Sequence, residues 1–373
     1  MKRIITFAAL ALSLIALGAC GEDTFEEKTN SVQVVSGKTE IGAAGGESKF
    51  VLTVDNFTAK PDDDWLKAAI SGNELTLSAE MNISKVSRHT YVTVTAENGD
   101  FITIPVTQLG MVYITDIPED VLSDDNANTY EYRVNTNLPL EISSPSWIRA
   151  AWNDGVLSVT LDKNPTGAMR TGTLKFEVPA ISASDSISFT QAEFSRDFAG
   201  KQFLFAGDNA DYLKGTSDRK TVVLLTEVEY NGSSYSLKFP DYGWSLPIKV
   251  NSSTWSFTLP NGTKLGMYES SHVFPVLNDF SANKNTFVKS YTMGVKVEYD
   301  PEIGFYAYAF NNNTWKNQNV NGYIFGKFKS TSFTTSNLTG YVFWLVNPFL
   351  VEYSMDNDEE TVVNMAMSKR FGD

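Results

Sequence analysis

Histidine and cysteine, the side chains that most often carry nucleophilic, acid–base or zinc chemistry, are scarce in this 373-residue chain. The two histidines are His89 and His272, and a serine-hydrolase triad would have to be built on His272. No Gly-x-Ser-x-Gly elbow accompanies it, and a zinc site would lack its usual ligands. We therefore predict that the protein is not an enzyme, has no catalytic residues, and takes no metal or cofactor.

Pairs of carboxylates are the remaining candidates for catalysis, because glycoside hydrolysis uses two of them. Glu227 and Glu229 lie on one face of an expected strand, as do Glu298 and Asp300. The acidic run at 62–64 could supply oxygen ligands to calcium, but it lacks the glycine and the spaced ligands of a calcium loop. Solvated strand faces and a solvated turn explain these residues better.

Three aromatic residues in polar turns are candidates for binding sugars. Trp315 lies in an amide-rich loop at 311–319, and Tyr242 and Trp244 lie in a second aromatic turn at 239–244. Sugar rings stack on aromatic faces, and amides pair well with hydroxyl groups. We predict that these three residues bind a ligand. The alternative is that Trp315 folds back onto the core, while the asparagines favour turns.

The single cysteine follows a targeting segment. Lys2 and Arg3 precede an apolar run at 4–17 that is too short to span a bilayer, which is typical of a secretory signal. Leu17-Gly18-Ala19-Cys20 resembles the lipobox of bacterial lipoproteins. That resemblance implies cleavage after residue 19 and attachment of lipid to the sulfur of Cys20. Acyl chains at that position would anchor the protein to a membrane.

An acidic tether follows the cysteine at residues 20–30 and has no apolar periodicity. It resembles the export signal that directs some lipoproteins to the outer face of the outer membrane. That resemblance implies an outer-membrane lipoprotein that faces the cell exterior, whereas a plain solvated linker is the alternative.

The charge balance excludes one class of partner. The chain has 30 basic and 44 acidic residues, which gives a net charge of −14. Loss of Lys2 and Arg3 with the signal leaves 28 basic residues and a charge of −16. Nucleic acid is therefore not expected as a partner, because binding phosphates requires clustered basic residues.

The elements that must position these residues are β-strands, and part of the chain is repeated. Alternating apolar and polar residues, with turns such as Asn98-Gly99, predict strands throughout. Four residues recur at an offset of 82 or 83: Trp65 as Trp147, Asn82 as Asn164, Arg88 as Arg170, and Gln108 as Gln191. We predict two copies of one immunoglobulin-like β-sandwich, at 31–110 and 111–193. Each tryptophan is expected in a core and each arginine at a loop carbonyl.

The repeated residues also resemble a known family. The Gly45-Gly46 turn, the Trp65-Leu66 pair, Asn82 with Arg88, and the closing sequence at 106–110 look like the BACON domain. The name stands for Bacteroidetes-Associated Carbohydrate-binding Often N-terminal. The resemblance covers the first copy well and the second moderately, and it implies a β-sandwich that binds carbohydrate.

The segment at 196–373 is a different domain. It holds 32 of the 47 aromatic residues, and its expected strands are longer, such as Thr221 to Tyr230 and Thr254 to Leu259. Successive hairpins predict an antiparallel barrel or sandwich. The whole chain is therefore predicted to be all-β.

The leading functional hypothesis is an anchored lipoprotein that binds glycans without catalysis and uses the two sandwich modules as a spacer. One alternative is a structural or adhesive lipoprotein whose last domain contacts another protein. The other is a lipocalin-like carrier that holds an apolar ligand inside the last domain.

Overall fold

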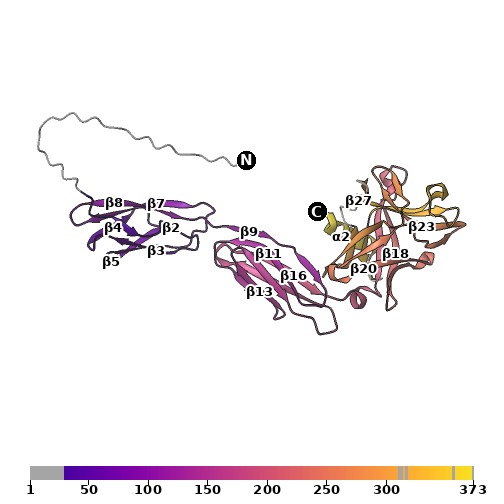
Figure 1. Cartoon of the computed structure of the whole chain (residues 1–373), viewed down its shortest axis with the longest axis horizontal. Coiled ribbons are helices and arrows are strands. Elements are labelled where there is room, and N and C mark those ends of the chain that lie inside the picture. The colour runs from indigo at the N-terminus through magenta and orange to yellow at the C-terminus, as the bar shows by residue number, and fades with distance from the viewer. Residues whose placement is uncertain (1–28, 310–313, 316–317, 355–357, 372–373) are drawn as a thin grey trace, which may run out of the picture. The chain divides into compact units, whose positions relative to one another are not determined.

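The computed structural model describes residues 29–309, 314–315, 318–354 and 358–371 (Figure 1). The signal at 1–19, Cys20 and the tether up to residue 28 lie outside the described residues. Contacts divide the chain into two compact units: one ends at Gly110, and the other comprises Met111–Asp373 with Ile83–Lys85. Among the described residues, no helix is both long and apolar enough to cross a membrane.

The first module is a sandwich of two four-stranded sheets, with strand orders β1-β3-β6-β5 and β2-β8-β7-β4. Apolar side chains at alternate positions point between the sheets and form one core, which includes Phe50, Leu75 and Val92. The strands are β1 Val34–Ser36, β2 Glu40–Ile41, β3 Gly46–Leu52, β4 Phe57–Pro61, β5 Leu66–Ser71, β6 Glu74–Ala79, β7 Arg88–Ala96 and β8 Phe101–Gln108.

The second module repeats this strand order. Its sheets are β13-β14-β11-β9 and β10-β16-β15-β12, and each strand takes the place of its counterpart in the first module. Its own core includes Val134, Leu157 and Phe176. The strands are β9 Tyr113–Asp116, β10 Asp120–Ser123, β11 Asn128–Thr136, β12 Glu141–Ser143, β13 Ile148–Asn153, β14 Val156–Leu161, β15 Arg170–Val178 and β16 Ala183–Gln191.

The last domain contains a closed barrel. Eight strands follow one another in the order β17-β18-β19-β20-β21-β25-β26-β30, and β30 pairs with β17 to close the ring. The sequence left barrel and sandwich open, and the structure shows the barrel. Its strands are β17 Gln202–Asn209, β18 Thr221–Tyr230, β19 Tyr235–Phe239, β20 Trp244–Asn251, β21 Ser256–Pro260, β25 Thr292–Asp300, β26 Gly304–Ala309 and β30 Leu338–Glu352.

Aromatic side chains fill the barrel interior. Residues at alternate positions of β18 point inward, and Phe205, Phe239 and Phe325 contact one another edge to face around the middle of the core. Outside the closed barrel, the long strand β30 also pairs with β29, and the sheet continues through further strands. A smaller core lies around Phe274 and Phe328. These strands are β22 Gly266–Tyr268, β23 Ser271–Asp279, β24 Lys284–Thr286 and β29 Gly322–Phe328, whereas β27 Thr314–Trp315 and β28 Gln318–Asn319 pair as a separate short hairpin.

Helices cover part of the outside of the barrel. The helix α2, Glu359–Phe371, places Val362, Val363 and Ala366 against outward residues of the wall such as Leu204 and Val351. A second short helix, α1 Ala210–Leu213, follows β17. The all-β fold class is confirmed, and α2 is an addition that the strand pattern did not predict.

One strand boundary differs from the prediction. The sequence pattern placed Trp255 inside a strand that begins at Thr254, but β21 begins at Ser256. Trp255 instead ends the short turn η4, Ser252–Thr254, with a left-handed backbone of φ 45°. The alternation of side chains continues through this turn, so the sequence pattern alone could not reveal the change of backbone.

Candidate functional site

The residues that recur in the first module form one polar cluster at the end of its sandwich. The guanidinium of Arg88 lies 4.4 Å from the ring centre of Trp65, and its Nε donates to Oε1 of Gln108 at 2.9 Å. The buried amide of Gln108 donates to the carbonyls of Gly42 and Glu80. The cluster therefore joins both sheets and a loop through hydrogen bonds.

The second module contains the same cluster. Arg170 lies 4.3 Å from the ring centre of Trp147, and its Nε donates to Oε1 of Gln191 at 2.8 Å. Arg170 also donates to the carbonyl of Asp162, as the sequence predicted for the arginines. Trp147, like Trp65, is half-buried and packs against its own core. The repeated residues are therefore explained by structure, because these side chains satisfy one another's hydrogen-bonding groups.

A different surface of the first module is exposed and unusual in composition. Apolar side chains of β7 and β8 that face the core alternate with an outward set that carries two large aromatic rings. Tyr91 is 55% exposed and Phe101 is 60% exposed. We name this set the β7–β8 outer face, and it consists of His89, Tyr91, Thr93, Thr95, Phe101, Thr103, Pro105 and Thr107.

The strand register fixes how these side chains are arranged. Tyr91 lies opposite Pro105, and Thr95 lies opposite Phe101. The two aromatic residues are therefore separated by four positions along the hairpin, about 13 Å at the usual rise per residue. Thr93 and Thr103 fill the space between them as a cross-strand pair. The result is a sheet face with an aromatic ring toward each end and hydroxyl groups between the rings.

Such a face has the chemistry that a neutral sugar chain requires. Aromatic rings offer their faces to the C–H groups of sugars, and hydroxyl groups can donate and accept hydrogen bonds. On the neighbouring strand β4, Lys60 lies opposite Thr93 and brings a positive charge beside the middle of this face. The eight residues of the face include no carboxylate, although Glu40 of β2 lies opposite Thr107 at its edge.

The second module provides a comparison within the same molecule. Its strands β15 and β16 have the same register, so Thr173 occupies the place of Tyr91 and Ser184 the place of Phe101. The outward residues of β15 and β16 are hydroxyl-bearing or charged, and include Lys175 and Glu177. The aromatic rings therefore belong to the first module and not to the shared sandwich framework.

The structure brings the predicted pair Tyr242 and Trp244 together but buries them to different extents. Trp244 is 2% exposed, stacks on Phe325, and donates from its indole nitrogen to the carbonyl of Met267 at 3.2 Å. Tyr242 is half-buried and stacks on Trp244 with ring centres 4.7 Å apart. Burial raises the pKa of the Tyr242 hydroxyl, with smaller contributions from nearby Asp241 and from Tyr268. Tyr242 is the member of the pair that still presents surface to a ligand.

Two other predicted residues lie partly or wholly outside the described residues. Trp315 pairs with Gln318 in the β27–β28 hairpin, but its side chain lies outside the described residues. Cys20 also lies outside them. Ligand binding by Trp315, Tyr242 and Trp244, and lipid attachment at Cys20, stay predictions.

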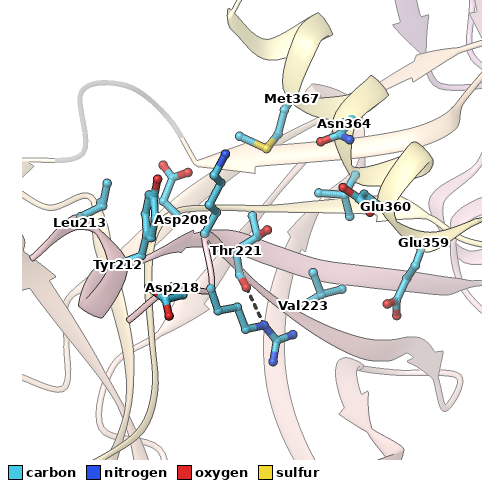
Figure 2. Close-up of a pocket in the computed structure, with 13 residues that line it drawn as sticks. Asp208, Tyr212, Leu213, Asp218, Thr221, Val223, Glu359, Glu360, Asn364 and Met367 are labelled. Carbon is cyan, nitrogen blue, oxygen red and sulfur yellow. Dashed lines mark hydrogen bonds between the residues drawn. The ribbon is translucent and has the colours of Figure 1, made fainter. Parts of the chain in front are cut away.

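The outer surface of the barrel has a groove that no sequence pattern predicted. It has a volume of about 760 Å³ and lies between α2, β18 and the segment around α1. Figure 2 shows Asn364 and Met367 of α2 and Tyr212 and Leu213 of α1 around this groove. Its lining combines residues of both charges with apolar residues; it comprises Asp208, Tyr212, Leu213, Asp218, Arg219, Lys220, Thr221, Val223, Glu359, Glu360, Val363, Asn364 and Met367.

Two of the four carboxylates considered for catalysis, Glu298 and Asp300, have structural partners that a solvated strand face does not explain. Tyr306 and Tyr308 donate to Glu298 at 2.8 and 2.7 Å, and Lys296 forms an ion pair with it. Asp300 is 3% exposed and accepts from backbone nitrogens in the following turn. Glu229 forms an ion pair with Lys238. Among the described residues, no cluster of three or more histidine, cysteine or acidic residues could hold a metal.

Comparison with known protein families identifies part of the first module. Residues 54–109 match the BACON family model, which is described as a putative binding domain, N-terminal. The matched segment includes both strands of the β7–β8 outer face and the Trp65–Arg88 cluster. No curated protein matches the sequence.

Solved structures resemble the chain weakly. An NMR structure of a protein from Bacteroides thetaiotaomicron is 20% identical, covers 24% of this chain and 96% of its own, and has a TM-score of 0.20. A Bacteroides ovatus GH5 xyloglucanase in complex with a XXXG heptasaccharide is 19% identical, covers 26% of this chain and 22% of its own, and also has a TM-score of 0.20. A chimeric titin Z1Z2 is 8% identical, covers 44% of this chain and 98% of its own, and has a TM-score of 0.30. These similarities are too low to carry a functional argument.

Proposed function

We propose that this protein is a membrane-anchored lipoprotein, exposed on the cell surface, that binds glycans without catalysis. The β7–β8 outer face of the first module is its binding surface. The second module is a diverged copy of the first that acts as a spacer. Cys20 carries the lipid, and the acidic tether directs the protein to the outside of the outer membrane.

The observation that carries the proposal is the pair of exposed aromatic rings on the matched putative binding domain. Tyr91 and Phe101 are more than half exposed on a sheet face whose other residues are mostly threonines. Exposed aromatic residues on a soluble domain are a typical feature of binding surfaces. Because the equivalent places in the second module hold Thr173 and Ser184, the sandwich does not need these rings to fold.

The carrier alternative has less support. A carrier holds its ligand inside the barrel, but the interior here is packed with aromatic side chains such as Phe205, Phe239 and Tyr323. Tyr323 is fully buried, and its hydroxyl donates to the carbonyl of Pro260. Opening a space for an apolar ligand would require these rings to be displaced.

A glycan array with residues 21–373 tests the proposal. We expect binding to neutral polysaccharides, weakened by Phe101→Ala and unaffected by Ser184→Ala at the equivalent place in the second module. A parallel array with Trp315→Ala measures what the last domain contributes. If the wild-type protein binds no glycan on the array, the proposed activity is wrong.

Fractionation of cells tests the anchor separately. The wild-type protein should appear in the outer-membrane fraction and incorporate labelled fatty acid, whereas Cys20→Ser should do neither. Protease added to intact cells should digest the wild-type protein. Recovery of Cys20→Ser in the membrane with its label would contradict lipid attachment at this residue.

A further inference from the structure

A pocket of about 420 Å³ lies beside the Trp65–Arg88 cluster of the first module. This volume falls within the range of about 300–1,000 Å³ that is typical of sites for small ligands. Most of its lining residues lie in or beside β5 and β6, whereas the β7–β8 outer face belongs to the other sheet of the sandwich. The lining comprises Asp64, Trp65, Lys67, Ser78, Ala79, Glu80, Met81 and Arg88.

The guanidinium group of Arg88 is held in place but is only partly used by the fold. Its Nε donates to Gln108, and its central carbon lies 4.4 Å from the ring centre of Trp65. Its two terminal nitrogens have no hydrogen-bond partner among the described residues, and neither is a buried atom, so both are accessible at the pocket that Arg88 lines. Arg88 therefore presents a pre-oriented pair of donors, the group that binds a carboxylate through two parallel hydrogen bonds.

The second module uses the equivalent donors internally. Arg170 corresponds to Arg88, and its Nη2 donates to the carbonyl of Asp162 at 2.6 Å. Glu80 corresponds to Asp162, but its carbonyl accepts from Gln108 and not from Arg88. The terminal nitrogens of the arginine are therefore less occupied in the first module than in the second.

Charged side chains of both signs line the pocket without pairing. Lys67 and Glu80 correspond to Arg149 and Asp162, which form an ion pair at 2.6 Å in the second module. In the described part of the chain, Lys67 and Glu80 form no such pair with each other or with another residue, and neither does Asp64. The pocket therefore brings together cations and carboxylates that do not satisfy one another.

This lining favours a small ligand that carries both charges. A simple anion would meet the carboxylates, and a simple cation would meet Arg88 and Lys67, so part of the lining repels either one. A zwitterion can place its carboxylate on the guanidinium group and its ammonium group beside Glu80. A neutral sugar could form hydrogen bonds here but would leave every charge without a counter-charge. The half-buried Trp65 and Met81 supply apolar surface for a ligand side chain.

We propose that the pocket beside Trp65 and Arg88 binds a zwitterionic amino acid or short peptide. The terminal nitrogens of Arg88 and the ammonium group of Lys67 bind its carboxylate, and Glu80 with Asp64 binds its ammonium group. This site does not depend on glycan binding at the β7–β8 outer face. The second module keeps the structural cluster but has lost the site, because its equivalent groups pair with one another.

Calorimetry with the 21–373 protein tests the proposal by blocking one ligand charge at a time. The panel comprises leucine, phenylalanine, glycyl-leucine and glycyl-phenylalanine, each with its N-acetyl derivative and its C-terminal amide. We expect at least one zwitterion to bind. Each of its singly blocked derivatives should bind about tenfold more weakly, because a charge-assisted contact is lost. The comparison of amino acids with dipeptides measures how far apart the two charges must lie.

Variants at exposed positions assign the contacts without disturbing the structural cluster. Glu80→Gln should weaken binding of the zwitterion and its amide but not of the N-acetyl derivative, which has no ammonium group. Lys67→Gln should still bind the zwitterion more tightly than its amide, because Arg88 keeps its contact with the carboxylate. Glu74→Gln makes the same change on β6 outside the pocket and should bind like the wild type. All three variants should keep the wild-type unfolding temperature.

A pair of substitutions copied from the second module tests the geometry at constant charge. Lys67→Arg with Glu80→Asp recreates the pairing of Arg149 with Asp162, so it should weaken zwitterion binding by about tenfold. The inference is overturned if no zwitterion binds, if blocked derivatives bind as tightly as the zwitterion, or if the copied pair binds like the wild type. Competition by a neutral disaccharide would also overturn it.

The glycan-binding face provides the last control. Tyr91→Ala with Phe101→Ala should leave zwitterion binding unchanged, because these rings lie on the other sheet. Loss of zwitterion binding in this double variant would place the ligand on the outer face and contradict the pocket. With this control, the pocket and the glycan-binding face succeed or fail separately.

Discussion

Gln108 shows at the residue scale why a few side chains recur in both modules. Its side chain is fully buried, accepts from Arg88, and donates to two backbone carbonyls, so removing it leaves several buried groups unpaired. Gln191 has the same role in the second module. Side chains that satisfy one another in this way cannot change singly without cost, and this explains their regular offset better than ligand contact does.

Gln108→Ala should therefore destabilise the first module by about 2–3 kcal/mol, since several buried partners lose a hydrogen bond. Hydrogen exchange measured by mass spectrometry should show faster exchange in peptides of β7 and β8, with the barrel unchanged. Gln33→Ala, at an exposed position, is the control. Exchange at wild-type rates in Gln108→Ala would show that the cluster does not hold the module together.

A second prediction at the residue scale concerns Glu298 and how its contribution to stability depends on pH. Because its folded pKa lies below its ordinary value of 4.5, its ionised form stabilises the fold above that pH, and the contribution is lost as pH falls through the folded pKa. Glu298→Gln should thus unfold at a lower temperature than the wild type near pH 7. The gap should narrow as the pH falls below 4.5 and through the folded pKa. A gap that stays constant across this range would mean that the charge of Glu298 does not contribute.

At the element scale, strands in which apolar and polar residues alternate were predictable from the sequence. Where a predicted strand boundary differs from the structure, the difference has a physical cause. The strand at Thr221 to Tyr230 has the expected bounds because one face contacts the barrel core and the other does not. Trp255 was misplaced because packing on Phe305 and Phe194 holds it in a left-handed turn that no residue pattern marks. The surrounding core over-determines this conformation.

The candidate site was harder to predict than the strands that carry it. Tyr91 and Phe101 lie in the two strands that flank the predicted Asn98-Gly99 turn, at positions that alternate with the buried ones and therefore point outward. Alternation cannot tell an exposed ring from a ring covered by a neighbour, which required the register and the exposed fractions. Trp244 shows the converse, since its polar turn suggested exposure but its ring packs into the barrel core.

The helix α2 was missed although it had a signal. Val362, Val363 and Ala366 recur with helical spacing, and Glu359 and Glu360 occupy the first turn, where acidic residues are favourable. In a chain of strands, thirteen residues near the end were too few to stand out. What makes this segment a helix is the outer face of the barrel, which its apolar side covers.

Val363→Asp should detach α2 from the barrel, because it buries an unpaired charge in the helix–barrel contact. We expect rapid hydrogen exchange throughout α2 with little change in β20 and β21. Asn364→Asp, the exposed neighbour, makes the same charge change without burial and should leave α2 protected. Equal protection of α2 in both variants would contradict this packing.

At the scale of the whole molecule, the three domains differ in where their aromatic residues lie. The first module presents aromatic rings, the second keeps the same sandwich without them, and the barrel carries most of the aromatic core. Arg196, at the start of the last domain, forms an ion pair with Asp125 of the second module at 2.7 Å, which fastens those two together. A net charge of −14 makes neutral glycans better partners than acidic ones.

The most direct test of the central claim compares two matched double variants by calorimetry, with the best neutral polysaccharide from the array as ligand. Tyr91→Ala with Phe101→Ala removes both rings of the first module, and Thr173→Ala with Ser184→Ala changes the equivalent places in the second. We expect the first pair to weaken binding by about a hundredfold, at about tenfold for each ring, and the second to bind like the wild type. Equal affinity of the two double variants would contradict glycan binding at the β7–β8 outer face.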